Sequence, residues 1–213
     1  MKLYYAKHTC AQGIHILLEE IGKPYEAVRI DFGKQENYKE PFTRLSPKSK
    51  VPILELDDGQ VLTEFGAIAT YLALTSPEAR LIPSDPLGHA RMVEALDYAV
   101  GTIHTQGFGR LFRTARFSPR EEDFDQVRAT GKAMVEKGLA WVSEALGDKE
   151  YIVGGFSLAD AALYYIENWA GEVDRKIGLA IPANVRAHFD RMTARPATRR
   201  ALEMGDYNAE TRM

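Results

Sequence analysis

The sequence predicts two domains of different class, an α/β domain over residues 1–80 and an all-helical domain over residues 87–213. Strand-like and helix-like segments alternate through the first part of the chain, whereas no convincing strand pattern follows residue 86. Between the two parts, prolines interrupt residues 81–86 and mark a linker.

The first thirty residues predict a strand, a helix and a second strand. Residues 2–6 have the pattern of a short strand, and apolar side chains within residues 14–21 recur at the spacing of one helix face. Gly22 and Pro24 are typical of a helix end, and β-branched side chains favour a strand over residues 25–30. This order gives a parallel pair of strands.

The rest of the first domain predicts a hairpin and a closing helix. Residues 32–50 are polar and interrupted by prolines, so we expect one short helix and loops there. Residues 51–56 and 61–62 have the pattern of two strands joined by a turn at residues 57–59. Residues 64–75 carry apolar side chains at helical spacing.

The second domain is predicted to contain helices alone. Apolar periodicity marks long helices over residues 92–103, 127–146 and 157–169. Pro182 and Pro196 stand where first-turn prolines belong in two shorter helices near the end.

The composition is that of a globular protein and excludes some classes of binding partner. Of 213 residues, 45% are hydrophobic and 27% charged, and the formal net charge of -3 leaves no basic surplus for a nucleic-acid partner. The single cysteine, Cys10, excludes an intrachain disulfide and a zinc site built on several thiolates. No segment approaches the ~20 apolar residues of a membrane span, and the first residues lack a signal-peptide pattern. We therefore expect no membrane partner and a cytoplasmic location.

Cys10 stands where the first predicted strand meets the first predicted helix. Unpaired N–H groups and the helix dipole stabilise an anion at this end of a helix. They can lower a cysteine pKa from ~8.5 into the range ~3.5–7.5 and produce a nucleophilic thiolate. On position alone, an inert buried residue is an equal alternative.

Two further segments of the first domain offer backbone groups to a ligand. Pro52 comes directly before a predicted strand. A cis bond before it would turn the N–H and C=O of Val51 toward a ligand backbone, although a trans proline that opens the strand is commoner. Thr63 and Glu64 begin the last helix of the domain, and they either cap it or frame an anion site at its start.

These patterns together resemble the cytosolic glutathione transferase family. SPKSKVPIL at residues 46–54, LDDGQVLTE at residues 56–64 and AIATYL at residues 67–72 are similar to the thioredoxin-like N-terminal domain of that family. GFSLAD at residues 155–160 and MTARPA at residues 192–197 are similar to its helical domain. The resemblance implies the glutathione transferase fold, an α/β thioredoxin-like N-terminal domain plus an all-α C-terminal domain.

Within the family, the opening MKLYYAKHTC and a histidine in the following long helix resemble the bacterial beta class. The resemblance places Cys10 beside the glutathione sulfur and His104 near it. It also implies that Val51 binds the cysteinyl backbone of glutathione, with Pro52 in the cis form. On spacing alone, a histidine near an apolar helix stripe is more often a packed helix residue.

The resemblance assigns the charged groups of glutathione to other residues. It places the γ-glutamyl carboxylate on Glu64 and on the N–H of Phe65, and Lys34 near the glycyl carboxylate. Asp97 and Arg128 resemble residues that reach the tripeptide across a dimer interface, which implies a homodimer.

Two positions depart from the family pattern. Ser49 stands where glycine is usual, and Phe65 stands where many classes have a serine whose hydroxyl holds the carboxylate. Because Phe65 offers only its backbone N–H, we expect carboxylate binding to be weaker than in those classes.

The resemblance implies an enzyme that joins the thiol of glutathione to a small apolar electrophile, with glutathione as co-substrate and no metal or redox cofactor. Thiol–disulfide exchange through Cys10 is a second expected activity. A non-catalytic ligand-binding protein on the same fold is the alternative. The second-substrate site is expected to include Phe108, Phe112 and Phe117, which could equally be core residues.

Overall fold

The computed structural model describes residues 1–207 and separates the chain into two compact units. Among the described residues, the first contains Met1–Leu81 together with residues 193–207, and the second contains Ile82–Met192. Each unit has its own buried core.

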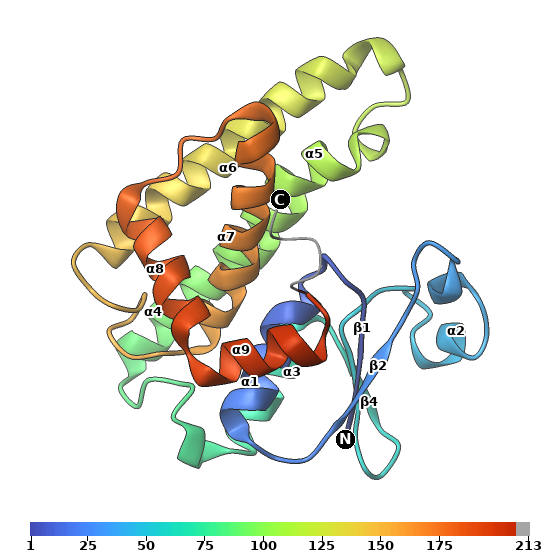
Figure 1. The fold of residues 1–213 in the computed structure, drawn as a ribbon, viewed down its shortest axis with the longest axis vertical. Helices are drawn as coiled ribbons and strands as arrows, with labels where there is room; N and C mark the ends of the chain where they lie inside the picture. The colour runs from blue at the N-terminus through green and yellow to red at the C-terminus, as the bar shows by residue number, and fades with distance from the viewer. Residues whose placement is uncertain (208–213) are drawn as a thin grey trace. The chain divides into compact units, whose positions relative to one another are not determined.

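The first unit is built on a four-stranded mixed sheet in the order β2-β1-β3-β4 (Figure 1). The central strand β1 is parallel to β2 and antiparallel to β3, so Leu3 lies between Ala27 and Leu54. Strand β4 extends the sheet as the return of the predicted hairpin. The strands are β1 (Lys2–Tyr5), β2 (Glu26–Arg29), β3 (Ile53–Glu55) and β4 (Val61–Thr63).

Helices cover both faces of this sheet, α1 and α3 on one side and α2 on the other (Figure 1). Helix α1 ends as predicted, because Gly22 adopts a left-handed φ of 71° and its N–H donates to the Leu18 carbonyl at 3.0 Å. The expected single helix within residues 32–50 is instead two short pieces, η1 and α2, separated by residues 39–41. The helices and 3₁₀ turns before the linker are α1 (Ala11–Ile21), η1 (Glu36–Tyr38), α2 (Phe42–Leu45), α3 (Phe65–Leu74) and η2 (Pro77–Ala79).

The last helix, α9 (Pro196–Met204), packs beside α1 in this same unit (Figure 1). Arg195 forms a two-bond ion pair with Glu20 at 2.7 and 3.0 Å, and Arg200 pairs with Glu19 at 2.7 Å. The sequence placed this segment in the helical domain because it is helical, but these long-range contacts group it with the sheet.

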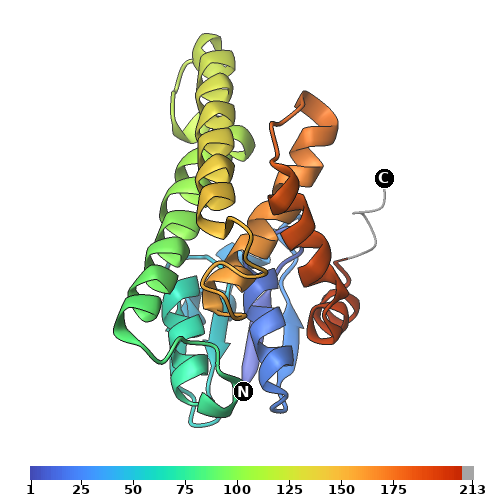
Figure 2. The ribbon, with the colours of Figure 1, turned by 90° about the vertical axis from the view of Figure 1, so that its left-hand side faces the viewer.

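The second unit is helical, with one long helical run lying beside α6 (Figure 2). Glycines allow this close approach, since a Cβ on Gly138 would lie 2.6 Å from Ile103 Cγ1 and one on Gly107 would lie 2.8 Å from Val135 Cγ2. The long run comprises α4 (Pro86–Asp97), η3 (Tyr98–Phe108) and α5 (Gly109–Phe112), and the other elements are η4 (Thr114–Arg116), η5 (Glu121–Asp123), α6 (Phe124–Leu146), α7 (Leu158–Ile177) and α8 (Ala183–Ala194).

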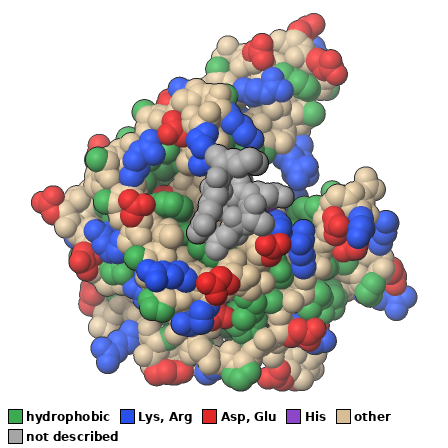
Figure 3. All heavy atoms as spheres, in the orientation of Figure 1, with side chains coloured by type: hydrophobic (Ala, Val, Ile, Leu, Met, Phe, Trp, Pro, Cys, Tyr) green, Lys and Arg blue, Asp and Glu red, His purple; other side chains and the backbone are tan. Residues whose placement is uncertain are grey.

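The surface carries both signs of charge. Lys and Arg side chains lie among Asp and Glu over the face drawn in Figure 3, in keeping with a net charge close to zero. In the part of the chain from residue 1 to residue 207, no helix is long and apolar enough to cross a membrane.

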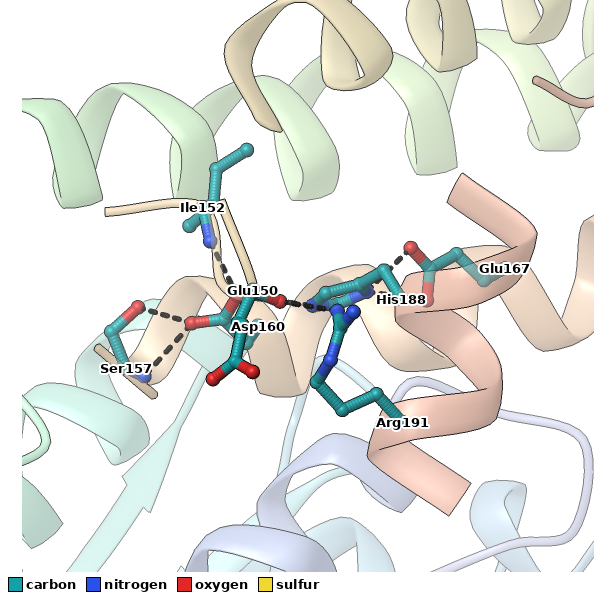
Figure 4. Close-up of polar contacts among 7 residues, drawn as sticks. All are labelled: Glu150, Ile152, Ser157, Asp160, Glu167, His188 and Arg191. Carbon is teal, nitrogen blue, oxygen red and sulfur yellow. Dashed lines mark hydrogen bonds and ion pairs between the residues drawn. The ribbon is translucent and has the colours of Figure 1, made fainter. Parts of the chain in front are cut away.

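A buried polar cluster joins α7, α8 and the loop between α6 and α7 (Figure 4). Asp160 accepts hydrogen bonds from the N–H and hydroxyl of Ser157, which forms a capping box at the start of α7. The second Asp160 oxygen accepts from the Ile152 N–H at 2.9 Å and lies 3.1 Å from His188 Nε2. His188 Nδ1 lies 2.8 Å from Glu167 Oε1, and the three charged side chains are all at least 98% buried.

The cluster holds His188 in its protonated form. Burial by itself would lower the pKa of His188, but attraction to Glu167 and hydrogen bonds to both carboxylates outweigh it and raise the pKa to about 10. Burial raises the pKa of Glu167 to about 7, against the attraction of His188. Because the carboxyl groups of Asp160 and Glu167 lie within 3.1 Å of the imidazole, we infer that His188 stays protonated and positively charged up to neutral pH.

His188→Gln is expected to lower the free energy of unfolding by about 3 kcal/mol at pH 6, because it removes the charged hydrogen-bond partner of two buried acidic side chains, Asp160 and Glu167. The folded-state pKa of His188 lies above its usual 6.5, so this contribution is complete below pH 6.5 and is lost as the pH rises toward 10. Urea unfolding at pH 6, 8 and 9.5 should therefore show that the difference in free energy of unfolding between the unmodified protein and His188→Gln decreases as the pH rises.

The matched control is His89→Gln, at an exposed position on α4 of the same unit. It is expected to change stability by no more than about 0.5 kcal/mol. If the free energies of unfolding of the unmodified protein and His188→Gln differ by the same amount at all three pH values, the assignment of the positive charge to His188 is wrong.

Candidate functional site

Cys10 lies at the start of α1, as the sequence predicts. The chain turns sharply after β1, where His8 takes a left-handed φ of 55° and the Thr9 hydroxyl donates to the Ala6 carbonyl at 2.7 Å. Cys10 then directs its sulfur toward the Val51 carbonyl oxygen, at 3.8 Å, and makes no side-chain bond to the N–H groups of its helix.

This orientation keeps the Cys10 thiol protonated. Burial of the thiol is the main cause that raises its pKa to about 12; the hydrogen bond from the backbone N–H of Cys10 itself opposes the rise, and the weaker effects of Glu64, which raises the pKa, and Lys50, which lowers it, follow. The expectation of a lowered pKa is therefore wrong for the protein without a ligand. The main reason is that burial disfavours the charged thiolate by more than the backbone donor stabilises it.

The segment before β3 brings Val51 to this sulfur. The Val51–Pro52 bond is cis, as the resemblance implies. Among residues 1–207, the backbone hydrogen bonds outside the helices and the sheet include none to the N–H or C=O of Val51. The Val51 carbonyl accepts only the weak contact from the Cys10 thiol at 3.8 Å.

Ser49 holds the turn that precedes Val51. It adopts a left-handed φ of 54°, which explains why glycine is usual at this position, since a residue with a Cβ pays roughly 1–2 kcal/mol there. The buried Asn37 side chain donates to the Ser49 carbonyl at 3.2 Å and fastens the turn to η1. Asn37 was not identified from the sequence, because nothing in the polar stretch around it marks it out.

Glu64 precedes α3 with an unusual backbone, φ 73° and ψ 132°. Such a conformation costs of order 1–3 kcal/mol for a residue with a side chain and is found at binding sites. Its carboxylate does not cap the helix but accepts from Lys48 Nζ at 2.7 Å, and Lys48 also donates to the Thr63 hydroxyl at 3.0 Å. The expected cap by Thr63 is wrong, because Glu64 is the residue that precedes the helix, no side chain caps it, and the buried Phe65 begins it.

The structure brings Cys10, Val51 and Glu64 together, as the direct contact and the charge effect on the thiol show. Two cations in this region, Lys48 and Lys50, were missed by the sequence analysis. Their position within the recognised segment SPKSKVPIL was the available signal.

Lys34 lies outside this group. Its side chain is 75% exposed and pairs with Asp31 at 3.5 Å, while its carbonyl accepts from Lys39 Nζ at 2.7 Å. Among the described residues, no hydrogen bond or ion pair connects Lys34 to Cys10, Val51 or Glu64.

In the helical unit, His104 lies within η3, where the hydrogen bonds are of the π-helical type. The Gly109 N–H, for example, donates to the His104 carbonyl five residues earlier. The half-buried imidazole has its Nδ1 3.2 Å from the Tyr165 hydroxyl and its ring edge-on to Trp169 at 4.8 Å. π-helical segments inside helices are often functional sites.

The aromatic residues expected near a second substrate differ in their surroundings. Phe108 is fully buried and stacks on Phe112 at 5.4 Å, and both rings meet the edge of Trp169 at 5.5 Å. Phe112 is 48% exposed. Phe117 lies beneath the Arg110 guanidinium, 4.3 Å away. Phe108 is thus a core residue, whereas Phe112 is exposed and Phe117 is half-buried.

Asp97 and Arg128 are on separate helices of the same unit. Asp97 is exposed at the end of α4, and Arg128 near the start of α6 lies 3.1 Å from the Asp125 carboxylate. Within residues 1–207, no group of three or more His, Cys, Asp or Glu side chains is arranged to hold a metal ion.

Comparison with known proteins places the chain in one family. Residues 9–75 match the glutathione S-transferase N-terminal domain, and residues 92–196 match the glutathione S-transferase C-terminal domain. The chain is 36% identical over 206 residues to the glutathione S-transferase GstA of Escherichia coli O157:H7, a match that covers 95% of this chain and 97% of that protein.

Two solved structures are similar over nearly the whole chain. A glutathione transferase homolog from Sulfitobacter with bound glutathione has a TM-score of 0.86 and 30% identity, with 96% of this chain and 97% of that chain covered. The bacterial beta class glutathione S-transferase of Sphingomonas chungbukensis has a TM-score of 0.81 and 30% identity, with 97% and 100% covered. This chain therefore belongs to the glutathione S-transferase family.

Proposed function

We propose that this protein is an enzyme that binds glutathione in its first unit and joins the glutathione sulfur to a small apolar electrophile. The observation that carries the proposal is the meeting of the Cys10 thiol, the Val51 backbone and Glu64 in one place. The bound glutathione of the Sulfitobacter homolog supports it, since that structure is similar over 96% of this chain.

In this proposal, backbone groups and charged side chains of the first unit hold the tripeptide. The N–H and C=O of Val51 pair with its cysteinyl residue as an added strand does. Its γ-glutamyl carboxylate lies at the start of α3, on the N–H of Phe65, where the helix dipole favours an anion. The Glu64 carboxylate suits the neighbouring ammonium group, and Lys34 suits the glycyl carboxylate.

Conjugation uses the glutathione thiol as the nucleophile. The S–H bond breaks and its proton passes to the imidazole of His104. The sulfur electron pair then forms the bond to carbon, and the leaving group departs with its own pair. The step involves glutathione as co-substrate and needs no metal or redox cofactor.

The raised pKa of Cys10 favours conjugation over thiol–disulfide exchange as the main activity. Exchange requires a thiolate on Cys10, whereas a protonated Cys10 can donate its S–H to the glutathione sulfur.

We also propose a cytoplasmic location and a homodimer, with small molecules rather than nucleic acid or a membrane as partners.

Exchange through Cys10 is expected to be slow at neutral pH. Because the pKa is about 12, the rate of mixed-disulfide formation with oxidised glutathione should rise about tenfold per pH unit from pH 7 to pH 9. Intact-protein mass spectrometry measures this rate, and the urea-unfolded chain, whose cysteine titrates near ~8.5, is the control. If the folded protein forms the mixed disulfide at the same rate from pH 7 to pH 9, then Cys10 is already a thiolate at neutral pH and the prediction is wrong.

The proposed base is tested by His104→Ala, assayed with a chlorinated nitroaromatic. The variant is expected to lower kcat by at least ~10-fold, roughly 1.4 kcal/mol of transition-state stabilisation, with a much smaller change in glutathione affinity. His89→Ala, an exposed histidine on α4, should leave both values unchanged. Unchanged kcat with reduced thermal stability would make His104 a packing residue instead.

The proposed dimer predicts a mass near twice the 23.8 kDa of one chain by light scattering at micromolar concentration. If Asp97 and Arg128 reach the partner's tripeptide, Asp97→Ala and Arg128→Ala should weaken glutathione binding in calorimetry while the dimer persists. A monomer at this concentration would refute the shared site.

A further inference from the structure

After α9 the chain makes a turn, residues 205–207, that packs against β1 and α1 within the first unit. The Tyr207 N–H donates to the Leu202 carbonyl at 3.0 Å and closes this turn. A Cβ on Gly205 would lie 2.1 Å from Cε2 of Tyr207, so the tyrosine ring can take this position only because residue 205 is glycine. We call residues 205–207 the 205–207 turn.

An ion pair holds the 205–207 turn to the segment that follows β1. Asp206 Oδ2 lies 2.5 Å from Lys7 Nζ and 3.8 Å from Arg29 Nη1. The Lys7 side chain is only 15% exposed, so its charge is largely enclosed and is compensated by Asp206. Asp206 makes this contact from a left-handed backbone, φ 51°, which a residue with a Cβ adopts at some cost.

The Tyr207 ring, 4% exposed, makes the second contact with this region. Its centroid lies 5.8 Å from that of Tyr5 on β1 and 5.9 Å from that of His15 on α1. His15 is fully buried, and its ring also meets the edge of Tyr25 at 5.6 Å. Burial lowers the pKa of His15 to about 4, against the effect of Glu19, so at neutral pH its contact with Tyr207 is one between two uncharged rings.

Both contacts lie next to Cys10. Lys7 belongs to the turn between β1 and α1, three residues before Cys10, and Tyr5 is the last residue of β1. The Cys10 thiol is close enough to Tyr207 to raise the pKa of the phenol, although burial and Tyr5 are the larger causes. The 205–207 turn therefore packs against the segment that decides how far the thiol is enclosed.

We propose that Asp206 and Tyr207 are positioning residues for Cys10. They hold the turn between β1 and α1, and so keep the thiol enclosed, directed at the Val51 carbonyl and slow to react. Without these contacts the turn between β1 and α1 can open locally, and the thiolate becomes accessible to reagents. The proposal concerns the protein without a ligand, so it goes beyond the proposed function and does not depend on it.

The test measures, by intact-protein mass spectrometry, how fast iodoacetamide alkylates Cys10 in the whole protein at neutral pH. Cys10 is the single cysteine, so the added mass reports this one site. Tyr207→Ala removes the ring and Gly205→Ala displaces it, and each is expected to raise the rate about tenfold. Asp206→Asn is expected to raise it about threefold, the effect of one partly exposed ion pair.

Two matched controls should react within about twofold of the unmodified protein. Tyr207→Phe keeps the ring, and Glu203→Gln removes one negative charge from an exposed position of α9. Equal alkylation rates for Tyr207→Ala and Tyr207→Phe would overturn the proposal.

Low concentrations of urea, below the unfolding transition, separate local opening from global unfolding. Opening of the turn between β1 and α1 exposes little surface, so the alkylation rate of Tyr207→Ala should stay nearly constant as urea is added. A rate that rises steeply with urea would show that Tyr207 stabilises the whole fold rather than the position of Cys10, and the proposal would be wrong.

Discussion

The contact between the Cys10 sulfur and the Val51 carbonyl decides the chemistry open to the first unit. A helix start normally offers N–H donors to a cysteine and favours the thiolate. Here the thiol is buried, with its sulfur turned toward an acceptor, and burial is the main cause that keeps its pKa raised and the proton on sulfur. A site built around a protonated cysteine is suited to donating a weak hydrogen bond to a second sulfur, and the nucleophile must then come from the ligand.

The same contact depends on two strained turns. Ser49 and Glu64 both carry side chains at positive φ, one on each side of Val51 in the chain. Each conformation is unfavourable by itself and is held by a specific partner, Asn37 for the first turn and Lys48 for the second. In the function that we propose, the backbone groups of Val51 are already in position for glutathione, which reduces the entropy that binding must overcome.

In the helical unit, small residues and buried charge fix the position of His104. Gly138 and Gly107 allow η3 to lie against α6 at a distance that a Cβ would prevent. The Tyr165 hydroxyl, presented by α7, lies by one ring nitrogen of His104, and α7 itself is fastened at its start by Asp160 and His188. The orientation of the imidazole therefore rests on a charged cluster at the beginning of the neighbouring helix.

The sequence by itself determined the order of elements and most of the residues at the candidate site. Apolar periodicity locates α1, α3, α6 and α7, because a helix face repeats every three to four residues whatever surrounds it. The recognised segments around Val51 and Glu64 mark the two turns to which we assign glutathione binding, because the backbone conformation of such turns restricts which residues fit. Only the tertiary structure decided that α9 packs beside α1 in the unit that contains the sheet. The ion pairs that hold it there join residues separated by 175 and 181 positions in the sequence. It also decided the protonation of Cys10, because a pKa depends on the groups that face the sulfur across the fold, and local sequence does not record them.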